Sequence, residues 1–98
     1  MKKLVKKLVE VVWVDAEELG DVGGNNLSKQ KRDAKKPCPT VRSVGFVLYE
    51  NDKHISLAST IGKDLCSTVE KIPKSFVQHI EELSYCKTKI ITQPNQKK

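Results

Sequence analysis

The chain has 98 residues, which suits one small domain, and its 18 lysine and arginine residues outnumber 12 aspartate and glutamate residues, giving a net charge of +6. This charge favours contact with nucleic acid or another anionic surface without requiring it. No apolar run approaches the roughly 20 residues that cross a bilayer as a helix, so we expect no membrane-spanning helix and no membrane partner.

The cysteines are too few and too scattered for a disulfide framework. The chain has an odd number of cysteines, and they lie far apart in the sequence, at Cys38, Cys66 and Cys86. A small secreted protein has a denser and usually even set of cysteines. Charged residues within MKKLVKKLVE also interrupt the apolar run that a signal peptide needs. We therefore expect reduced thiols and a cytoplasmic protein.

The first predicted element is a strand over residues 8–16, LVEVVWVDA, which is rich in valine and contains the only tryptophan. The overlapping segment 2–9, KKLVKKLV, has some features of an amphipathic helix at a membrane surface. Only four of its eight side chains are apolar. We therefore expect residues 2–9 to begin the first strand or to form a short capping helix.

Residues 17–39, EELGDVGGNNLSKQKRDAKKPCP, contain paired glycines, paired asparagines, two prolines and few apolar residues. Such a composition buries too little surface to offset the entropy lost on ordering. We expect a long mobile loop here, inserted between the first two strands. A loop of this length within a small domain is often functional or disordered.

Three further segments have the composition of strands. Residues 40–50, TVRSVGFVLYE, and residues 54–61, HISLASTI, are separated by the polar turn NDK and predict a hairpin. The turn GKD then precedes a predicted fourth strand over residues 65–72, LCSTVEKI.

The segment KIPKSFVQHIEEL (71–83) has two interpretations. As a helix that begins near Pro73, it places four apolar side chains on one face. As a strand from Phe76 to Leu83, it alternates less well, but it would cover an edge that the four preceding strands leave exposed. The pattern alone leaves both interpretations open.

Several blocks, namely VVWVDA, VRSVGFVLYE, HISLAST and IPKSFVQHIEEL, resemble a group of short uncharacterised proteins encoded by tailed bacteriophages. Those proteins share a start of the form VxWxDA, a middle segment of valine, glycine and hydrophobic residues, and an ending of the form IPxxxVxxIxxL. The resemblance implies a non-enzymatic accessory or binding module of a phage, which acts in the cytoplasm of the host cell.

A more distant similarity is to the Sm-like fold, a strongly bent five-stranded barrel that commonly assembles into rings. Gly45 matches the glycine at which the second strand of that barrel bends, whereas Ala16 replaces the glycine of the turn after its first strand. IPKSFVQHI matches the spacing of the apolar positions in the family's last strand, IRGDNVVYI. The similarity therefore favours a tight turn after Pro73 and a strand from Phe76 to about Leu83.

The expected fold is all-β: a small, five-stranded, strongly bent, partly open barrel of Sm-like or SH3-like type. Residues 1–87 would form the single domain, with residues 17–39 as a flexible inserted loop and residues 88–98 as a disordered tail. In Sm-like rings the edge strands, here LCSTVE and FVQHIEEL, pair between subunits. The resemblance, the exposed edges and the small core together predict a homo-oligomer.

The same similarity weakens the case for RNA recognition by the family's own site. Members that bind uridine-rich RNA use a loop asparagine and an Arg-Gly pair. Here Lys53 and His54 occupy the asparagine region, and Pro73 and Lys74 occupy the Arg-Gly positions. Lysine contacts a phosphate but lacks the planar, bidentate geometry of arginine or asparagine.

The basic segment 29–36, KQKRDAKK, is the best candidate for a nucleic-acid contact. A flexible basic loop can neutralise several phosphates without reading the base sequence. A loop that only promotes solubility would explain the segment equally well. The candidate contact residues are Lys29, Lys31, Arg32, Lys35 and Lys36, with Lys53 and Lys74 as helpers.

The sequence gives no support for catalytic or metal chemistry. Its cysteines and histidines form no CxxC or HxxxH pattern and no Cys–His signature. The two Glu-Glu pairs suit solvated positions, because adjacent strand residues point in opposite directions. The Gly-Gly pair lacks the lysine of a phosphate-binding loop. We therefore expect no enzyme, no metal, no cofactor and no small-molecule substrate.

Overall fold

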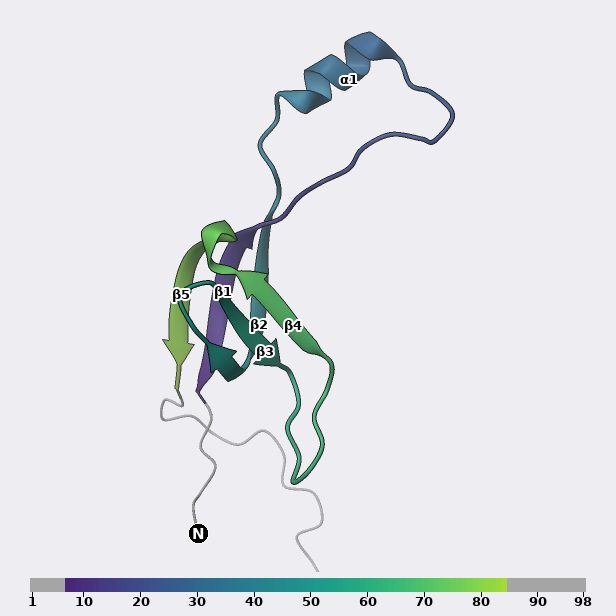
Figure 1. Ribbon diagram of the computed structural model, residues 1–98. Helices are drawn as coiled ribbons and strands as arrows, with labels where there is room; N and C mark the ends of the chain where they lie inside the picture. Colours follow the sequence, from purple (N-terminus) through teal and green to yellow (C-terminus); the bar gives the residue numbers. More distant parts are fainter. Residues whose placement is uncertain (1–6, 85–98) are drawn as a thin grey trace, which may run out of the picture.

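A computed structural model describes residues 7–84 of the chain (Figure 1). Its elements are β1 (Leu8–Val14), α1 (Leu27–Ala34), β2 (Thr40–Glu50), β3 (His54–Ala58), β4 (Val69–Pro73), the 3₁₀ turn η1 (Lys74–Phe76) and β5 (Val77–Leu83). The five strands form one sheet in the order β4-β3-β2-β1-β5, and every neighbouring pair is antiparallel. Over residues 7–84 the sheet is not closed, since β4 and β5 each have one neighbour.

The prediction of a mainly β protein with five strands is therefore confirmed. The third strand ends at Ala58 and the fourth begins at Val69, so both are shorter than predicted. A single bridge between Ile61 and Cys66 closes the loop between them. The segment after Pro73 is a short turn followed by a strand, and the helical interpretation of it is wrong.

The expectation that residues 17–39 lack regular structure is wrong for residues 27–34. These residues form α1, which begins after Asn26, whose side chain accepts a hydrogen bond of 2.9 Å from the backbone N–H of Lys29. An ion pair between Lys29 and Asp33, one turn apart, supports the same helix. Capping and i,i+4 pairing are local interactions, and they stabilise a helix that buries no residue.

Two expectations lie outside the described residues. One is the disordered tail over residues 88–98, and the other is the structure of the part of segment 2–9 that precedes residue 7.

The core of the sheet is small. Buried apolar side chains come from β1, β3 and β4, and partly buried apolar side chains from β1, β2 and β5 pack against them. The buried set is Val9, Val11, Ile55, Leu57 and Ile72, and the partly buried set is Trp13, Val47, Val77 and Ile80. The indole N–H of Trp13 donates a 3.0 Å hydrogen bond to the hydroxyl of Ser43, so its polar atom is satisfied where it is partly buried.

Gly45 lies where β2 passes from β1 to β3. It faces Val9 of β1, and the next residue, Phe46, pairs with Ala58 of β3. A Cβ atom on Gly45 would lie 3.0 Å from the carbonyl oxygen of Ala58 and 3.1 Å from the Cβ of Leu57. Only glycine fits here without displacing β3.

The connection between β4 and β5 requires the sheet to curl. Neighbouring strands lie about 4.8 Å apart, so a flat sheet would separate its two edge strands by roughly 19 Å. The chain from Pro73 to Val77 spans at most about 14 Å even when fully extended. The edges must therefore approach each other at this end of the sheet, where Figure 1 shows η1 beside the end of β1.

Residues 15–39, which we call the arm, leave the sheet at the same end. The N–H of Asp15 donates a 3.0 Å hydrogen bond to the carbonyl of Pro39, which closes the base of the arm. From this base the arm projects away from the sheet and carries α1 at its far end (Figure 1).

Candidate nucleic-acid interface

The structure places the seven predicted contact residues in two groups. The first group lies on α1 and just after it: Lys29, Lys31, Arg32, Lys35 and Lys36. The second group is Lys53, in the turn between β2 and β3, and Lys74, in η1. The backbone N–H of Lys74 donates to the carbonyl of Lys53 at 2.8 Å. The first group stands at the far end of the arm and the second at the end of the sheet near the arm's base (Figure 1).

Within the arm, α1 contacts the preceding limb, residues 17–26. The side-chain amide of Gln30 donates to the carbonyl of Leu19 at 3.2 Å. Asp21 and Asn25 exchange two hydrogen bonds of 2.9 Å and close a loop before the helix. Gly20 has φ +111°, a conformation that glycine adopts without strain, and a Cβ there would lie 2.7 Å from the amide nitrogen of Gln30. The arm therefore has its own internal hydrogen bonds.

Asp33 holds two of the five cations. Its carboxylate lies 2.9 Å from the ammonium of Lys29 and 3.4 Å from that of Lys36. The hydrogen bond from Lys29, and then that from Lys36, lower the pKa of the Asp33 carboxyl below its ordinary value. These three residues line a shallow hollow together with Glu17 and Leu19. This side of α1 therefore faces the preceding limb.

The remaining cations have no contact with the Asp33 carboxylate. Lys31, Arg32 and Lys35 are exposed, and within residues 7–84 none of them has a salt-bridge partner. Lys31 and Lys35 are one turn apart and therefore lie on one side of the helix. The structure thus divides a basic segment that looks uniform in the sequence into two paired and three unpaired cations.

The second group is less available for a phosphate contact than the sequence predicts. The ammonium of Lys74 pairs with the carboxylate of Glu50 at 2.9 Å, and its side chain is 27% exposed. Lys53 is exposed, in a turn fixed by the side-chain oxygen of Asn51, which accepts hydrogen bonds from the N–H groups of Lys53 and His54. Of the two predicted helpers, only Lys53 therefore presents a cation without an ion pair among the described residues.

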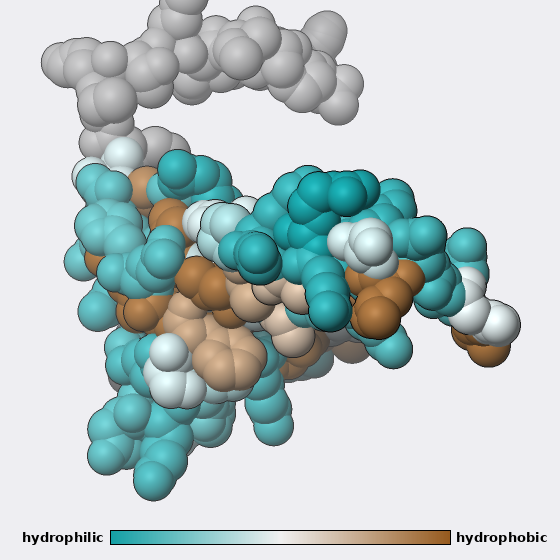
Figure 2. Space-filling model, turned by 90° about the horizontal axis from the view of Figure 1, so that it is seen from above, coloured by the Kyte–Doolittle hydropathy of each residue, from teal (hydrophilic) through white to brown (hydrophobic). Residues whose placement is uncertain are grey.

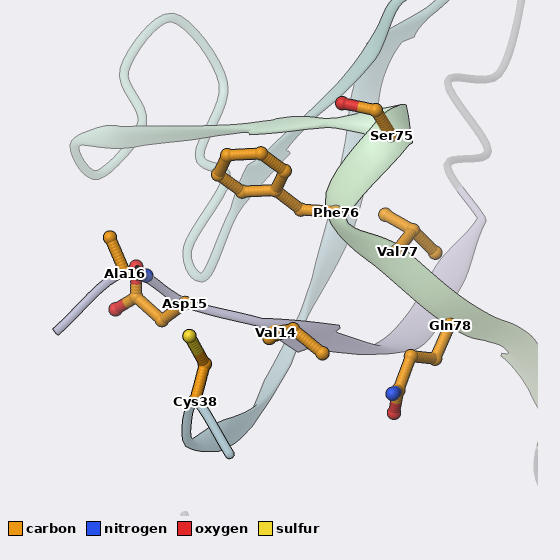
Figure 3. A pocket seen from close by; sticks show the side chains of 8 residues that line it. All are labelled: Val14, Asp15, Ala16, Cys38, Ser75, Phe76, Val77 and Gln78. Atoms are coloured by element: carbon orange, nitrogen blue, oxygen red, sulfur yellow. Dashed lines mark hydrogen bonds between the residues drawn. The ribbon is translucent and has the colours of Figure 1, made fainter. Parts of the chain in front are cut away.

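A groove that the sequence did not indicate lies between the base of the arm and the beginning of β5 (Figure 3). It has a volume of about 530 Å³, and its lining is Val14, Asp15, Ala16, Cys38, Ser75, Phe76, Val77 and Gln78. The ring of Phe76, which is 43% exposed, extends over the hollow toward Ala16 (Figure 3). The irregular pairing of β5 with Trp13 of β1 occurs at the same place, and sequence periodicity carries no signal for it.

Hydrophobic surface on the arm is divided into small patches. Leu19, Val22 and Leu27 are exposed, and Figure 2 shows apolar spots on the projecting arm separated by hydrophilic surface. A continuous apolar face would suit a membrane or a buried protein contact, whereas scattered apolar side chains are ordinary on a surface. The exposed surface of the arm is therefore mainly hydrophilic, with only small apolar patches.

Residues 7–84 contain no group of three or more histidine, cysteine, aspartate or glutamate side chains arranged to hold a metal ion. The single helix in this range, α1, is too short and too polar to cross a membrane. Comparisons of the chain with protein-family models, with curated proteins and with solved structures find no match.

Proposed function

We propose that this protein is a non-enzymatic binding module, a small barrel of Sm-like or SH3-like type encoded by a phage, and that it self-associates through the edges of its sheet in the cytoplasm of the host cell. The observation that carries the proposal is the open sheet with β4 and β5 as its two edges. The curl of the sheet and the close approach of β2 to β3 at Gly45 support the proposed barrel type.

Two physical arguments favour self-association. An unpaired strand edge presents backbone N–H and C=O groups that a second chain can bind. Six buried apolar residues among residues 7–84 are also few for a domain of this size, and assembly would bury more surface. Exposed charges lie on both edge strands, Glu70 and Lys71 on β4 and Glu81 and Glu82 on β5, so Lys71 can pair with a glutamate of a neighbouring β5.

The test is the mass in solution, measured by size-exclusion chromatography with light scattering over a range of concentrations. We expect a multiple of the 11.0 kDa chain mass. Lys71→Glu should lower this mass, and adding Glu81→Lys and Glu82→Lys should restore it. Lys63→Glu, at an exposed position outside the strands, is the matched control. A mass of one chain at every concentration would contradict self-association.

A second candidate function, nucleic-acid binding by residues 29–36, is favoured by the exposed cations of α1 that have no ion pair within the described part of the chain. Phosphate contacts of this kind release counterions and depend steeply on salt. Exposed Tyr49 packs against His54, with ring centroids 5.6 Å apart, and this pair next to Lys53 could stack on a base.

Fluorescence anisotropy with labelled single-stranded RNA and DNA, over a salt series, tests this second function. Affinity should fall steeply as salt rises. A flat response at low salt would exclude phosphate binding and leave the first proposal in place.

A further inference from the structure

We propose that only three cations of α1, namely Lys31, Arg32 and Lys35, form the nucleic-acid contact, and that Asp33 withholds Lys29 and Lys36 from it. This inference rests on the second function proposed above and assigns its contact surface. The partner is a phosphate backbone, bound without base recognition.

Asp33 and two of the unpaired lysines lie on opposite sides of α1. Residues of an α-helix advance by 100°, so Lys31 and Lys35, each two residues from Asp33, lie about 200° around the helix from it. They are therefore on the side opposite the carboxylate. Arg32 lies about 100° from Asp33, on the flank of the helix that it shares with Lys36, and unlike Lys29 and Lys36 it has no ion pair among the described residues.

Asp33 faces the preceding limb of the arm. Gln30 and Asp33 are the only partly buried residues of α1, and the remaining six are exposed. Gln30 donates to the carbonyl of Leu19, and Asp33 shares a hollow with Glu17 and Leu19. The preceding limb therefore covers the carboxylate side of α1 and leaves the Lys31 side open to a partner.

An approaching phosphate meets different charges on different sides of α1. Beside the limb, the carboxylates of Asp33 and Glu17 repel it, and Lys29 and Lys36, whose side chains are 63% and 70% exposed, already have Asp33 as an anionic partner. Away from these carboxylates it meets Lys31, Arg32 and Lys35, which need not break an ion pair of the described residues. Lys31 and Lys35 are about 6 Å apart along the helix axis, so their long side chains can reach neighbouring phosphates of one strand.

The number of phosphate contacts determines how steeply the affinity falls with salt. For duplex DNA, the slope of log affinity against log salt is about −0.9 per phosphate contacted, so three contacts give about −2.7 and five give about −4.5. Raising the salt from about 50 to about 200 mM should lower the affinity about 40-fold with three contacts and about 500-fold with five.

The experiment measures anisotropy of a labelled DNA duplex with the full chain and three variants over this salt range. The triple variant Lys31→Gln, Arg32→Gln, Lys35→Gln should lose binding, whereas the double variant Lys29→Gln, Lys36→Gln should keep its affinity within about twofold and its slope near −2.7. Asp33→Asn, which frees two lysines, should tighten binding and steepen the slope toward about −4.5. Circular dichroism of each variant checks that the fold is kept.

The outcomes separate this inference from the function on which it rests. If the wild type binds but the double variant loses affinity as much as the triple variant, or if Asp33→Asn leaves the slope unchanged, the division of the cations is wrong while nucleic-acid binding stands. If the wild type does not bind the duplex at low salt, both are overturned. Binding to vesicles of phosphatidylserine, with none to DNA, would overturn nucleic acid as the partner.

Discussion

The sheet and the arm are adjacent in the chain but are stabilised by different interactions. The sheet buries apolar side chains that are far apart in sequence, such as Val11, Ile55 and Ile72. The arm's helix buries no residue and depends on a capping side chain, a side-chain hydrogen bond to Leu19 of the preceding limb and an ion pair one turn apart. Burial provides most of the free energy of folding, whereas each local interaction of the arm contributes little.

The two regions therefore differ in how much free energy a change of conformation costs. A short helix without apolar contacts is marginally stable in water, so its conformation costs little to change and benefits from a partner. The sheet provides a fixed base from which the arm projects, as Figure 1 shows. Substitutions in the two regions should therefore change the stability of the protein by different amounts, and three substitutions test this.

The largest effect is expected in the core. Ile55 is fully buried, and Ile55→Ala should lower the free energy of unfolding by about 2–5 kcal/mol, because it removes apolar contacts and leaves a cavity. Leu27→Ala, at a position in the arm that is 68% exposed, is the control and should change it by less than about 0.5 kcal/mol. Urea unfolding followed by tryptophan fluorescence measures both. Equal losses would show that the arm takes part in the core.

A smaller effect is expected where β2 approaches β3. Gly45→Ala should cost about 1–3 kcal/mol, because the added Cβ meets the backbone of Ala58 and the side chain of Leu57. Gly23→Ala in the arm meets no atom within 4 Å and should leave the sheet's stability unchanged. The measurement is again urea unfolding. A neutral Gly45→Ala would mean that β2 and β3 can separate freely.

The smallest effect on the whole protein is expected at the helix cap. Asn26→Ala removes the acceptor for the N–H of Lys29 and should destabilise α1 by about 0.5–2 kcal/mol, with no change in the unfolding of the sheet. Amide hydrogen exchange should be faster in α1 and unaltered in β1. Asn26→Asp, which keeps an acceptor, should preserve the protection of α1. Faster exchange across both elements would contradict independent stability of the two regions.

The sequence by itself determined the elements whose signals are local. Valine-rich and alternating segments predicted the first four strands, and the turn around Asn51 was visible as a polar break between two of them. The signals for α1 were also local, namely the cap at Asn26 and the i,i+4 pair of Lys29 and Asp33. The helix was nevertheless not predicted, because the composition of residues 17–39 indicates disorder and composition contains no information about capping.

The tertiary structure decided what depends on distant residues. The pattern of residues 76–83 suited a helix as well as a strand, and the strand forms because β1 is available as its partner, with Ile80 opposite Val11. The curl of the sheet follows from joining its two edges by η1, and the groove at Phe76 exists only where the arm's base meets β5. The number of cations in the arm can be read from the sequence, but which of them pair with Asp33 is decided by the folded arm. The direction of each side chain depends on the helix that carries it and on the segment that packs against that helix.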